Sequence, residues 1–245
     1  MLDFNHGTTK KVTNLTNSIN INEQLNRLID TALTTVHKEQ PERHYLGASR
    51  LGVSCTRMLQ YEFQKVPKDE GKEFTGQTLR NFAAGHVFEE LAIKWLQGAG
   101  FTLLTEDEQG QQFGFKAAGG NIAGHVDGII TGVPDGFTLA TPALWEMKSM
   151  NNKSWQETVK KGLVIAKPLY AAQIAMYQAY MEEKFAGISA NPALFTAINK
   201  DTAELYHELI PFDAELAQRI SDKAVNIILS QQLLINSSTI TQLKY

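Results

Sequence analysis

Residues 124–149 decide the fold: they comprise GHVDGII, a turn-rich loop and ALWEMKS. The two apolar runs predict two strands, of which the first carries Asp127 and the second carries Glu146 and Lys148. Side chains alternate between the two faces of a strand, so Glu146 and Lys148 point to one side and Met147 to the other. If the two strands pair, Asp127 joins them. Two carboxylates and an ammonium group would then meet at one place on a sheet.

This combination of charges has a chemical use. Two carboxylates suit Mg²⁺ or Mn²⁺, which prefer oxygen ligands and keep several water molecules. The lysine is a compact charge that can hold a water molecule or stabilise a developing negative charge. A charged strand end can produce the same short pattern without any catalytic role, so the neighbouring motifs decide between the two interpretations.

Composition limits the class of protein. The chain has 245 residues, of which 43% are apolar and 20% charged, so it can bury a substantial core as one large domain or one domain with appendages. Its net charge of −3 means that any contact with nucleic acid must come from a local basic patch. The single cysteine, Cys55, excludes an internal disulfide framework and a cysteine-cluster metal site. We see neither an apolar run of membrane-spanning length nor a leader segment, and we expect a cytoplasmic protein without a membrane partner.

The pattern along the chain predicts one domain over residues 21–236, with its core at about 45–212. A flexible tail is expected at 1–20 and a polar tail at 237–245. Asn22 is a candidate cap for the first helix, whose apolar residues recur at helical spacing up to Val36. We expect helices over about 22–40, 54–63, 78–97, 153–162 and 168–185 and from 213, and strands over about 101–105, 111–116, 121–131, 143–150, 192–200 and 203–212.

Two of the predicted helices carry polar residues that can reach the sheet. In the helix over 78–97, Glu89 and Glu90 lie among apolar residues, and His86 precedes Glu89 by one turn. The ordinary interpretation is a solvent-facing pair of Glu90 with a lysine, which fits Glu90 better than Glu89. In the helix over 168–185, Gln173 and Tyr177 are spaced to share one face. Such residues are usually just half-buried, but their place after the strand with Glu146 favours a functional role.

A third candidate segment is LGASRLGVSCTR at 46–57. Ser49, Ser54 and Arg57 are donors near the start of a predicted helix, a setting that suits a phosphate group. Taken without the other motifs, these residues are better explained by ordinary helix capping and a surface arginine.

The order of these motifs over about residues 45–185 resembles the PD-(D/E)xK nuclease superfamily. More narrowly it resembles the RecB-like branch that includes lambda exonuclease and the YqaJ-type phage recombinases. The resemblance implies an α/β fold with a three-layer α/β/α restriction-endonuclease-like core, in which helices flank a central mixed β-sheet.

The resemblance also implies roles for residues. The ligands of one or two Mg²⁺ or Mn²⁺ ions would be Glu89, Asp127, Glu146 and the backbone carbonyl of Met147. Lys148 would be the catalytic lysine, and Gln173 would steady that lysine or the attacking water.

Further residues follow from the same resemblance. Tyr177, Ser49 and Arg57 would contact DNA, the latter two through a phosphate. His86 and His125 are candidates for supporting the metal ligands without binding the ion. Many relatives carry a four-cysteine iron–sulfur cluster, which the single cysteine of this chain excludes.

The function implied is a Mg²⁺-dependent deoxyribonuclease that degrades linear DNA from an end, in phage-type recombination or repair. Its partners would be DNA, a single-strand annealing protein and further copies of itself, in a bacterial cytoplasm or a phage-infected host. The alternatives are a structure- or sequence-specific endonuclease of the same superfamily and a DNA-binding subunit that has lost catalysis. The presence of all the acidic positions and the lysine argues against the last.

Overall fold

The computed structural model describes the backbone of residues 20–242 and the side chains of residues 20–230. The predicted N-terminal tail lies outside the described residues apart from Asn20, as do residues 243–245 of the predicted C-terminal tail. The chain divides into two compact units, Met1–Gln40 with Phe74–Arg80 and Pro41–Glu73 with Asn81–Tyr245. The units are described separately below, and the second is called the main unit.

The first unit contains helix α1 (Ile21–Glu39) and the first residues of α3 (Gly76–Gly98). The cap of α1 is Asn20 and not the predicted Asn22: the Asn20 side chain accepts a hydrogen bond from the Glu23 N–H at 3.3 Å. The predicted apolar stripe is present, but α1 has no buried residue and Leu28 is 63% exposed. Apolar periodicity therefore predicted the helix correctly, while burial of its apolar face is not seen.

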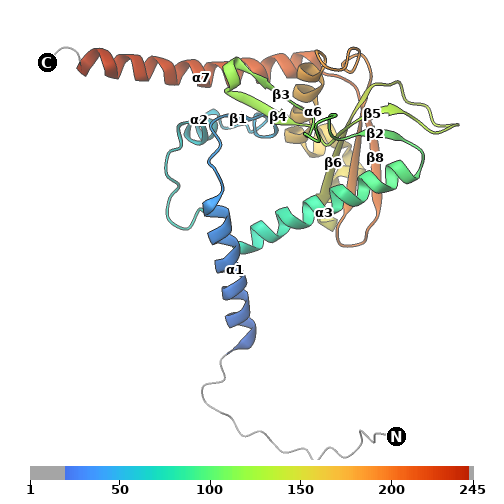
Figure 1. The fold of residues 1–245 in the computed structure, drawn as a ribbon, viewed down its shortest axis with the longest axis horizontal. Helices are drawn as coiled ribbons and strands as arrows, with labels where there is room; N and C mark the ends of the chain where they lie inside the picture. The colour runs from blue at the N-terminus through green and yellow to red at the C-terminus, as the bar shows by residue number, and fades with distance from the viewer. Residues whose placement is uncertain (1–19, 243–245) are drawn as a thin grey trace, which may run out of the picture. The chain divides into compact units, whose positions relative to one another are not determined.

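A five-stranded mixed sheet forms the centre of the main unit (Figure 1). All neighbouring strands in it are antiparallel except β6 (Ala143–Met150) and β7 (Ala193–Asn199), which are parallel. A smaller three-stranded sheet lies beside it. The strands of the large sheet, in spatial order, are β2 (Thr102–Leu104), β5 (Gly128–Gly132), β6 (Ala143–Met150), β7 (Ala193–Asn199) and β8 (Leu205–Ile210). Those of the small sheet are β1 (Leu46–Gly47), β4 (Ile122–His125) and β3 (Gly114–Ala117).

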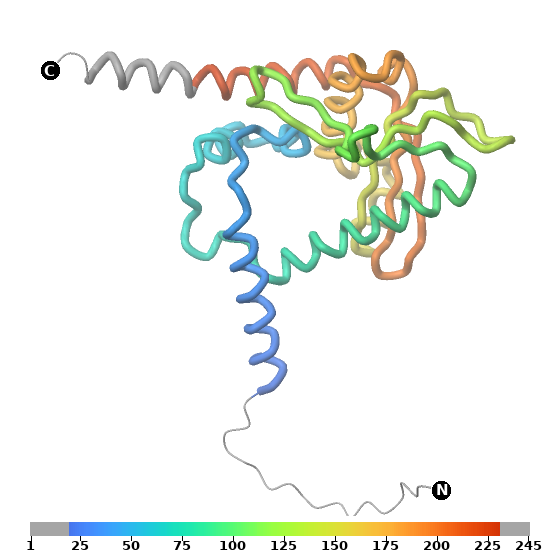
Figure 2. Tube along the Cα trace, viewed as in Figure 1, coloured from blue at the N-terminus to red at the C-terminus, as the bar shows by residue number. Residues whose placement is uncertain are grey.

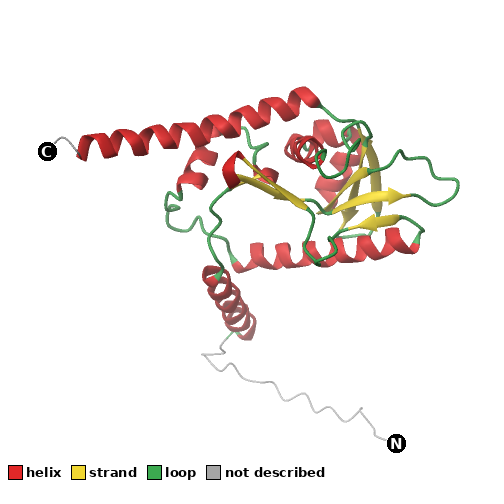
Figure 3. Cartoon of the chain, turned by 45° about the horizontal axis from the view of Figure 1, so that its top comes forward, coloured by secondary structure: helices red, strands yellow, loops and turns green. Residues whose placement is uncertain are grey.

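Helices cover both faces of the large sheet (Figure 3). The part of α3 within the main unit packs on one face through Phe88, Ala92 and Leu96. The other face is covered by α6 (Pro168–Met181), with α4 (Asn152–Lys161) and α5 (Leu163–Ala166) leading into it. The prediction of a three-layer α/β/α core with a central mixed sheet is therefore confirmed.

A further layer lies on the outer side of α6. There α7 (Ala214–Gln242) and α2 (Thr56–Gln64) bury a second apolar cluster against α6. In Figure 2 the packed beginning of α7 is the red part of the tube. Helix α7 extends to Gln242, past the point near 236 where the polar composition predicted that a tail would begin. None of the described helices has the length and apolar composition that a membrane crossing requires.

The predicted strand over 121–131 is in fact two strands in different sheets. β4 pairs with β3 and β1, whereas β5 pairs with β2 and β6. The chain changes sheets at Val126, whose N–H donates to the Phe113 carbonyl at 2.9 Å. Local sequence could not reveal this break, because it is made by hydrogen bonds to residues distant in the chain. It places Asp127 between the two strands, where its side chain is free to bond elsewhere.

Candidate active site

Strand β6 sorts its side chains onto the two faces of the large sheet. Trp145 and Met147 pack with the cluster under α3, while Leu144 and Met150 pack with the cluster under α6. By the same alternation Glu146 faces α6, where it is fully buried with 0% exposure. The apolar run that makes β6 a central strand therefore also carries a carboxyl group into the core, where a charge is costly without partners.

Only one of the two Glu146 carboxylate oxygens is satisfied. Oε1 accepts from the Lys148 ammonium in a short contact and from Gln173 Nε2 at 2.5 Å. Oε2 is buried and has no hydrogen-bond partner. Burial raises the pKa of Glu146 to about 8; the Asp127 carboxylate adds to the rise and Lys148 opposes it. An unpartnered buried oxygen on an acid of this kind is a position that a cation would satisfy.

Asp127 joins the site through a backbone hydrogen bond. The pairing of β5 with β6 ends at Gly128 opposite Trp145. Beyond that point the Met147 N–H donates to Asp127 Oδ2 at 2.8 Å instead of to a strand carbonyl. The side chain of Asp127 thus replaces the missing backbone acceptor and is fixed beside Glu146.

Lys148 lies among the oxygens of these residues. Its Nζ contacts Glu146 Oε1, lies 3.0 Å from the Met147 carbonyl oxygen and 3.8 Å from Asp127 Oδ2. Burial lowers its pKa, but the carboxylates of Glu146 and Asp127 outweigh burial and raise the pKa above its ordinary value. Lys148 is therefore held as an ammonium ion. Its Nζ also lies 5.5 Å from the ring centroid of Tyr170, a residue that sequence reasoning did not single out.

Glu89 approaches the same group from α3. A Cβ added at Gly85, one turn earlier, would lie 3.6 Å from Ser149 Oγ, so α3 passes close to β6 there. Burial, followed by the Asp127 charge, raises the pKa of Glu89, and His86 opposes the rise. His86 Nδ1 is 3.8 Å from Glu89 Oε2, although the His86 side chain is 79% exposed. Glu89 interacts electrostatically with Asp127 and Lys148, but the interaction is not a hydrogen bond.

Helix α6 supplies Gln173 and Tyr177 on one face, as their spacing predicts. Tyr177 is 3% exposed, and its ring meets Phe115 edge-on with centroids 5.8 Å apart. A Cβ at Gly124 would lie 2.7 Å from Tyr177 Cε1, so β4 can pass this ring only with glycine there. Burial and then the Glu146 charge raise the pKa of the Tyr177 hydroxyl. The ring of Tyr177 lies inside the core. Its predicted contact with DNA stays a prediction.

The remaining candidates lie around this group rather than in it. Ser49 is half-buried in the 3-10 turn η1 (Ala48–Arg50), which packs against α6. Arg57 is exposed in the first turn of α2, and His125 is exposed at the end of β4. The roles assigned to these three residues stay predictions.

The donor atoms fit a hard divalent cation in kind. Two carboxylates, a backbone carbonyl and a third acid nearby are oxygen ligands of the type that Mg²⁺ and Mn²⁺ prefer. The buried Glu146 Oε2 without a partner and the ammonium seated against Glu146 Oε1 and the Met147 carbonyl both indicate a place for positive charge. Over the described residues, however, no three His, Cys, Asp or Glu side chains are gathered into a ready coordination shell.

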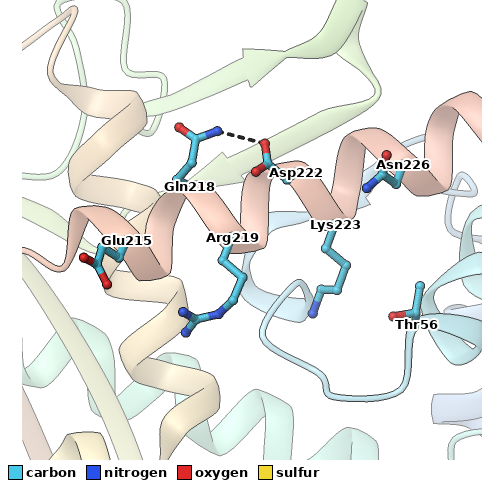
Figure 4. A pocket seen from close by; sticks show the side chains of 7 residues that line it. All are labelled: Thr56, Glu215, Gln218, Arg219, Asp222, Lys223 and Asn226. Carbon is cyan, nitrogen blue, oxygen red and sulfur yellow. Dashed lines mark hydrogen bonds between the residues drawn. The ribbon is translucent and has the colours of Figure 1, made fainter.

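A separate hollow of about 590 Å³ lies between α2 and α7 and contains none of the predicted site residues (Figure 4). Arg219 and Lys223 point into it, but Lys223 Nζ already donates to the Val53 carbonyl at 2.9 Å. The lining carries two acids as well as two bases and so favours no charged ligand. It is formed by Thr56, Glu215, Gln218, Arg219, Asp222, Lys223 and Asn226.

The fold has known relatives among solved structures, although no family model and no curated protein sequence matches the chain. One similar structure is that of an alkaline exonuclease (LHK-Exo) from Laribacter hongkongensis, with a TM-score of 0.54 and 15% sequence identity over 89% of this chain and 98% of that one. The structure of LHK-Exo in complex with dAMP has a TM-score of 0.51 and 16% identity, over 82% of this chain and 94% of that one. At such low identity the likeness shows the fold.

Proposed function

We propose that this chain is a metal-dependent DNA exonuclease that hydrolyses phosphodiester bonds of linear DNA from an end. The observation that carries the proposal is Glu146, an acid with 0% exposure whose Oε2 has no partner and which lies beside Lys148 and Asp127. A structural protein gains nothing from this arrangement, because a buried acid with an unsatisfied oxygen is costly. The likeness in fold to an alkaline exonuclease supports the choice of reaction.

In this proposal Asp127 and Glu146, with the Met147 carbonyl and Glu89, hold one or two Mg²⁺ or Mn²⁺ ions. A bound divalent cation supplies charge neutralisation at the phosphate and lowers the pKa of a water molecule. Gln173 holds the Glu146 carboxyl group by donating to Oε1 at 2.5 Å. Oε2 has no hydrogen-bond partner and would be available to the ion.

Lys148 has the role of orienting the attacking water and stabilising negative charge on the phosphate. The pKa of Lys148 lies above its ordinary value, so the ammonium charge is available at neutral pH. A phosphate bound beside Lys148 would meet this positive charge.

The test is digestion of duplex DNA labelled at either end, with Mg²⁺, Mn²⁺ or EDTA, by the wild-type protein and by Glu146→Gln. We expect metal-dependent release of nucleotides from an end, an intact covalently closed plasmid, and loss of activity in the variant. Glu208→Gln on β8 is the matched control. Glu208 is also a hydrogen-bonded glutamate, but it accepts from the Leu163 N–H and the Tyr206 hydroxyl and takes no part in the proposed site. Cleavage of the closed plasmid would indicate an endonuclease, and DNA binding without cleavage in any metal would indicate a binding subunit.

A further inference from the structure

One face of α6 carries a third polar residue beside Gln173 and Tyr177. Tyr170 precedes Gln173 by three positions and Tyr177 by seven, which is the spacing of one helical face. It lies in the first turn of α6, where its N–H donates to the Lys167 carbonyl at 2.9 Å. The helix therefore presents Tyr170, Gln173 and Tyr177 in a row towards β6.

Two residues of this row contact the ion pair of Glu146 and Lys148, one residue for each member of the pair. Gln173 Nε2 donates to Glu146 Oε1, while the Tyr170 ring stands 5.5 Å from Lys148 Nζ. An ammonium within about 6 Å of an aromatic centroid is attracted by the negative face of the ring, by about 0.5–2 kcal/mol depending on exposure. Lys148 is thus held on one side by carboxylates and on another side by an aromatic ring.

The ring limits where the ammonium can go. A lysine side chain has four flexible bonds and would otherwise follow the carboxylates wherever they draw it. Tyr170 is itself fixed, because it is half-buried and packs against the apolar cluster under α6. A fixed ring beside a flexible ammonium defines one position for the charge.

We propose that Tyr170 is a positioning residue, whose aromatic ring holds the Lys148 ammonium where it meets the scissile phosphate and the attacking water. The inference rests on the proposed nuclease function and extends it to a residue outside the predicted motif. The ring carries the effect, and the hydroxyl is dispensable.

The test compares Tyr170→Phe, which keeps the ring, with Tyr170→Leu, which removes it. The single-turnover rate of cleavage of end-labelled duplex DNA should fall by about 3- to 30-fold in Tyr170→Leu and stay within about 2-fold of wild type in Tyr170→Phe. The affinity for the same DNA, measured in EDTA, should be unchanged in both. Tyr206→Leu is the control, because Tyr206 packs against the same apolar cluster from β8 and its hydroxyl bonds Glu208.

A second measurement does not depend on catalysis. An ammonium over a ring gives its neighbouring CH₂ protons an upfield ring-current shift, which NMR detects once the Lys148 signal is assigned by its loss in Lys148→Arg. The shift should be present in the wild type and Tyr170→Phe and absent in Tyr170→Leu.

The proposal is overturned by a wild-type cleavage rate in Tyr170→Leu, by a Tyr170→Phe rate as low as that of Tyr170→Leu, or by an unchanged Lys148 shift in Tyr170→Leu. If the wild-type protein cleaves no DNA, the proposed function fails. The NMR comparison then decides separately whether Tyr170 positions Lys148.

Discussion

At the scale of single residues, one face of β6 carries apolar side chains that stabilise the fold, and the other face carries the charged side chains of the candidate site. Trp145 and Met147 anchor the strand under α3 with apolar surface, and Glu146 and Lys148 occupy the opposite face. Because Glu146 is wholly buried, its environment is set by a few named atoms rather than by solvent. Single substitutions at these atoms should therefore have separable effects on folding and on cleavage.

Glu89 tests the contribution of α3. We expect Glu89→Gln to reduce cleavage by at least about 100-fold, because it removes a carboxylate that interacts with Asp127 and Lys148. Glu90→Gln on the same helix should stay within about 2-fold of wild type, since Glu90 is exposed. Initial rates on end-labelled duplex DNA measure both. Equal losses in the two variants would contradict a specific role for Glu89.

Asp127 has a structural bond as well as a charge, and two substitutions separate them. Asp127→Asn keeps an oxygen that can accept the Met147 N–H, so its thermal midpoint should stay near that of wild type. Asp127→Ala leaves that N–H without its acceptor and should lower the free energy of unfolding by about 1 to 3 kcal/mol. Both should bind Mn²⁺ more weakly by calorimetry. An Asn variant as unstable as the Ala variant would show that the charge, and not the hydrogen bond, holds the loop.

At the scale of elements, close approaches position the site. A Cβ at Gly52 would lie 2.8 Å from Ala172 Cβ and 3.0 Å from the Leu169 carbonyl oxygen, so the segment before α2 packs directly on α6. Gly52→Ala should force the two apart and cost about 1–3 kcal/mol. Gly98→Ala at the end of α3 is the control, because its Cβ meets nothing within 4 Å. Urea unfolding compares them, and equal stability of the two variants would rule out the close packing.

A polar chain crosses three neighbouring strands and gives the main unit a pH dependence. Trp145 Nε1 donates to Thr196 Oγ1 at 3.0 Å, and Thr196 Oγ1 lies 3.1 Å from His207 Nδ1. If the threonine accepts from the tryptophan and donates to the histidine, Nδ1 must carry no proton. His207 is exposed as a whole residue, but partial desolvation of its ring agrees with this, since it lowers the pKa of His207 below its ordinary value of 6.5.

A lowered pKa in the folded state means that the contribution of His207 to stability is full above pH 6.5. It is lost as pH falls through the folded pKa. Urea unfolding at pH 7.5 and 5.5 should therefore show a larger loss of unfolding free energy for wild type than for His207→Gln. Equal losses in the two proteins would mean that His207 does not titrate in this way.

The elements also show how far sequence reasoning reaches. The predicted strand over 143–150 and the start of α6 at Pro168 match the structure, because buried apolar runs and a proline at a first helical turn are local signals. The break at Val126 is invisible locally, because it depends on which distant strands supply partners. Tyr170 was missed although its spacing from Gln173 was readable, because a tyrosine at the core face of a helix is usually only packing.

At the scale of the whole molecule, cation binding should appear in the global stability of the protein. In metal-free protein the pKa of Glu146 is raised to about 8, from an ordinary value of 4.5. A carboxyl group with a raised pKa favours folding at low pH, and this contribution is lost as pH rises from about 4.5 to 8. A cation bound at Glu146 would favour the charged form and remove that loss.

Thermal unfolding with and without Mn²⁺ at pH 6.5 and 8.5 tests this linkage without any DNA. Below pH 8 the cation must displace a proton from Glu146, so its apparent affinity should fall as pH is lowered. At 100 times the dissociation constant the cation stabilises the folded state by about 2.7 kcal/mol. We therefore expect Mn²⁺ to raise the wild-type midpoint more at pH 8.5 than at 6.5, and to raise that of Glu146→Gln little at either pH. An equal rise in the variant would place the cation away from Glu146 and remove the main support for the proposed mechanism.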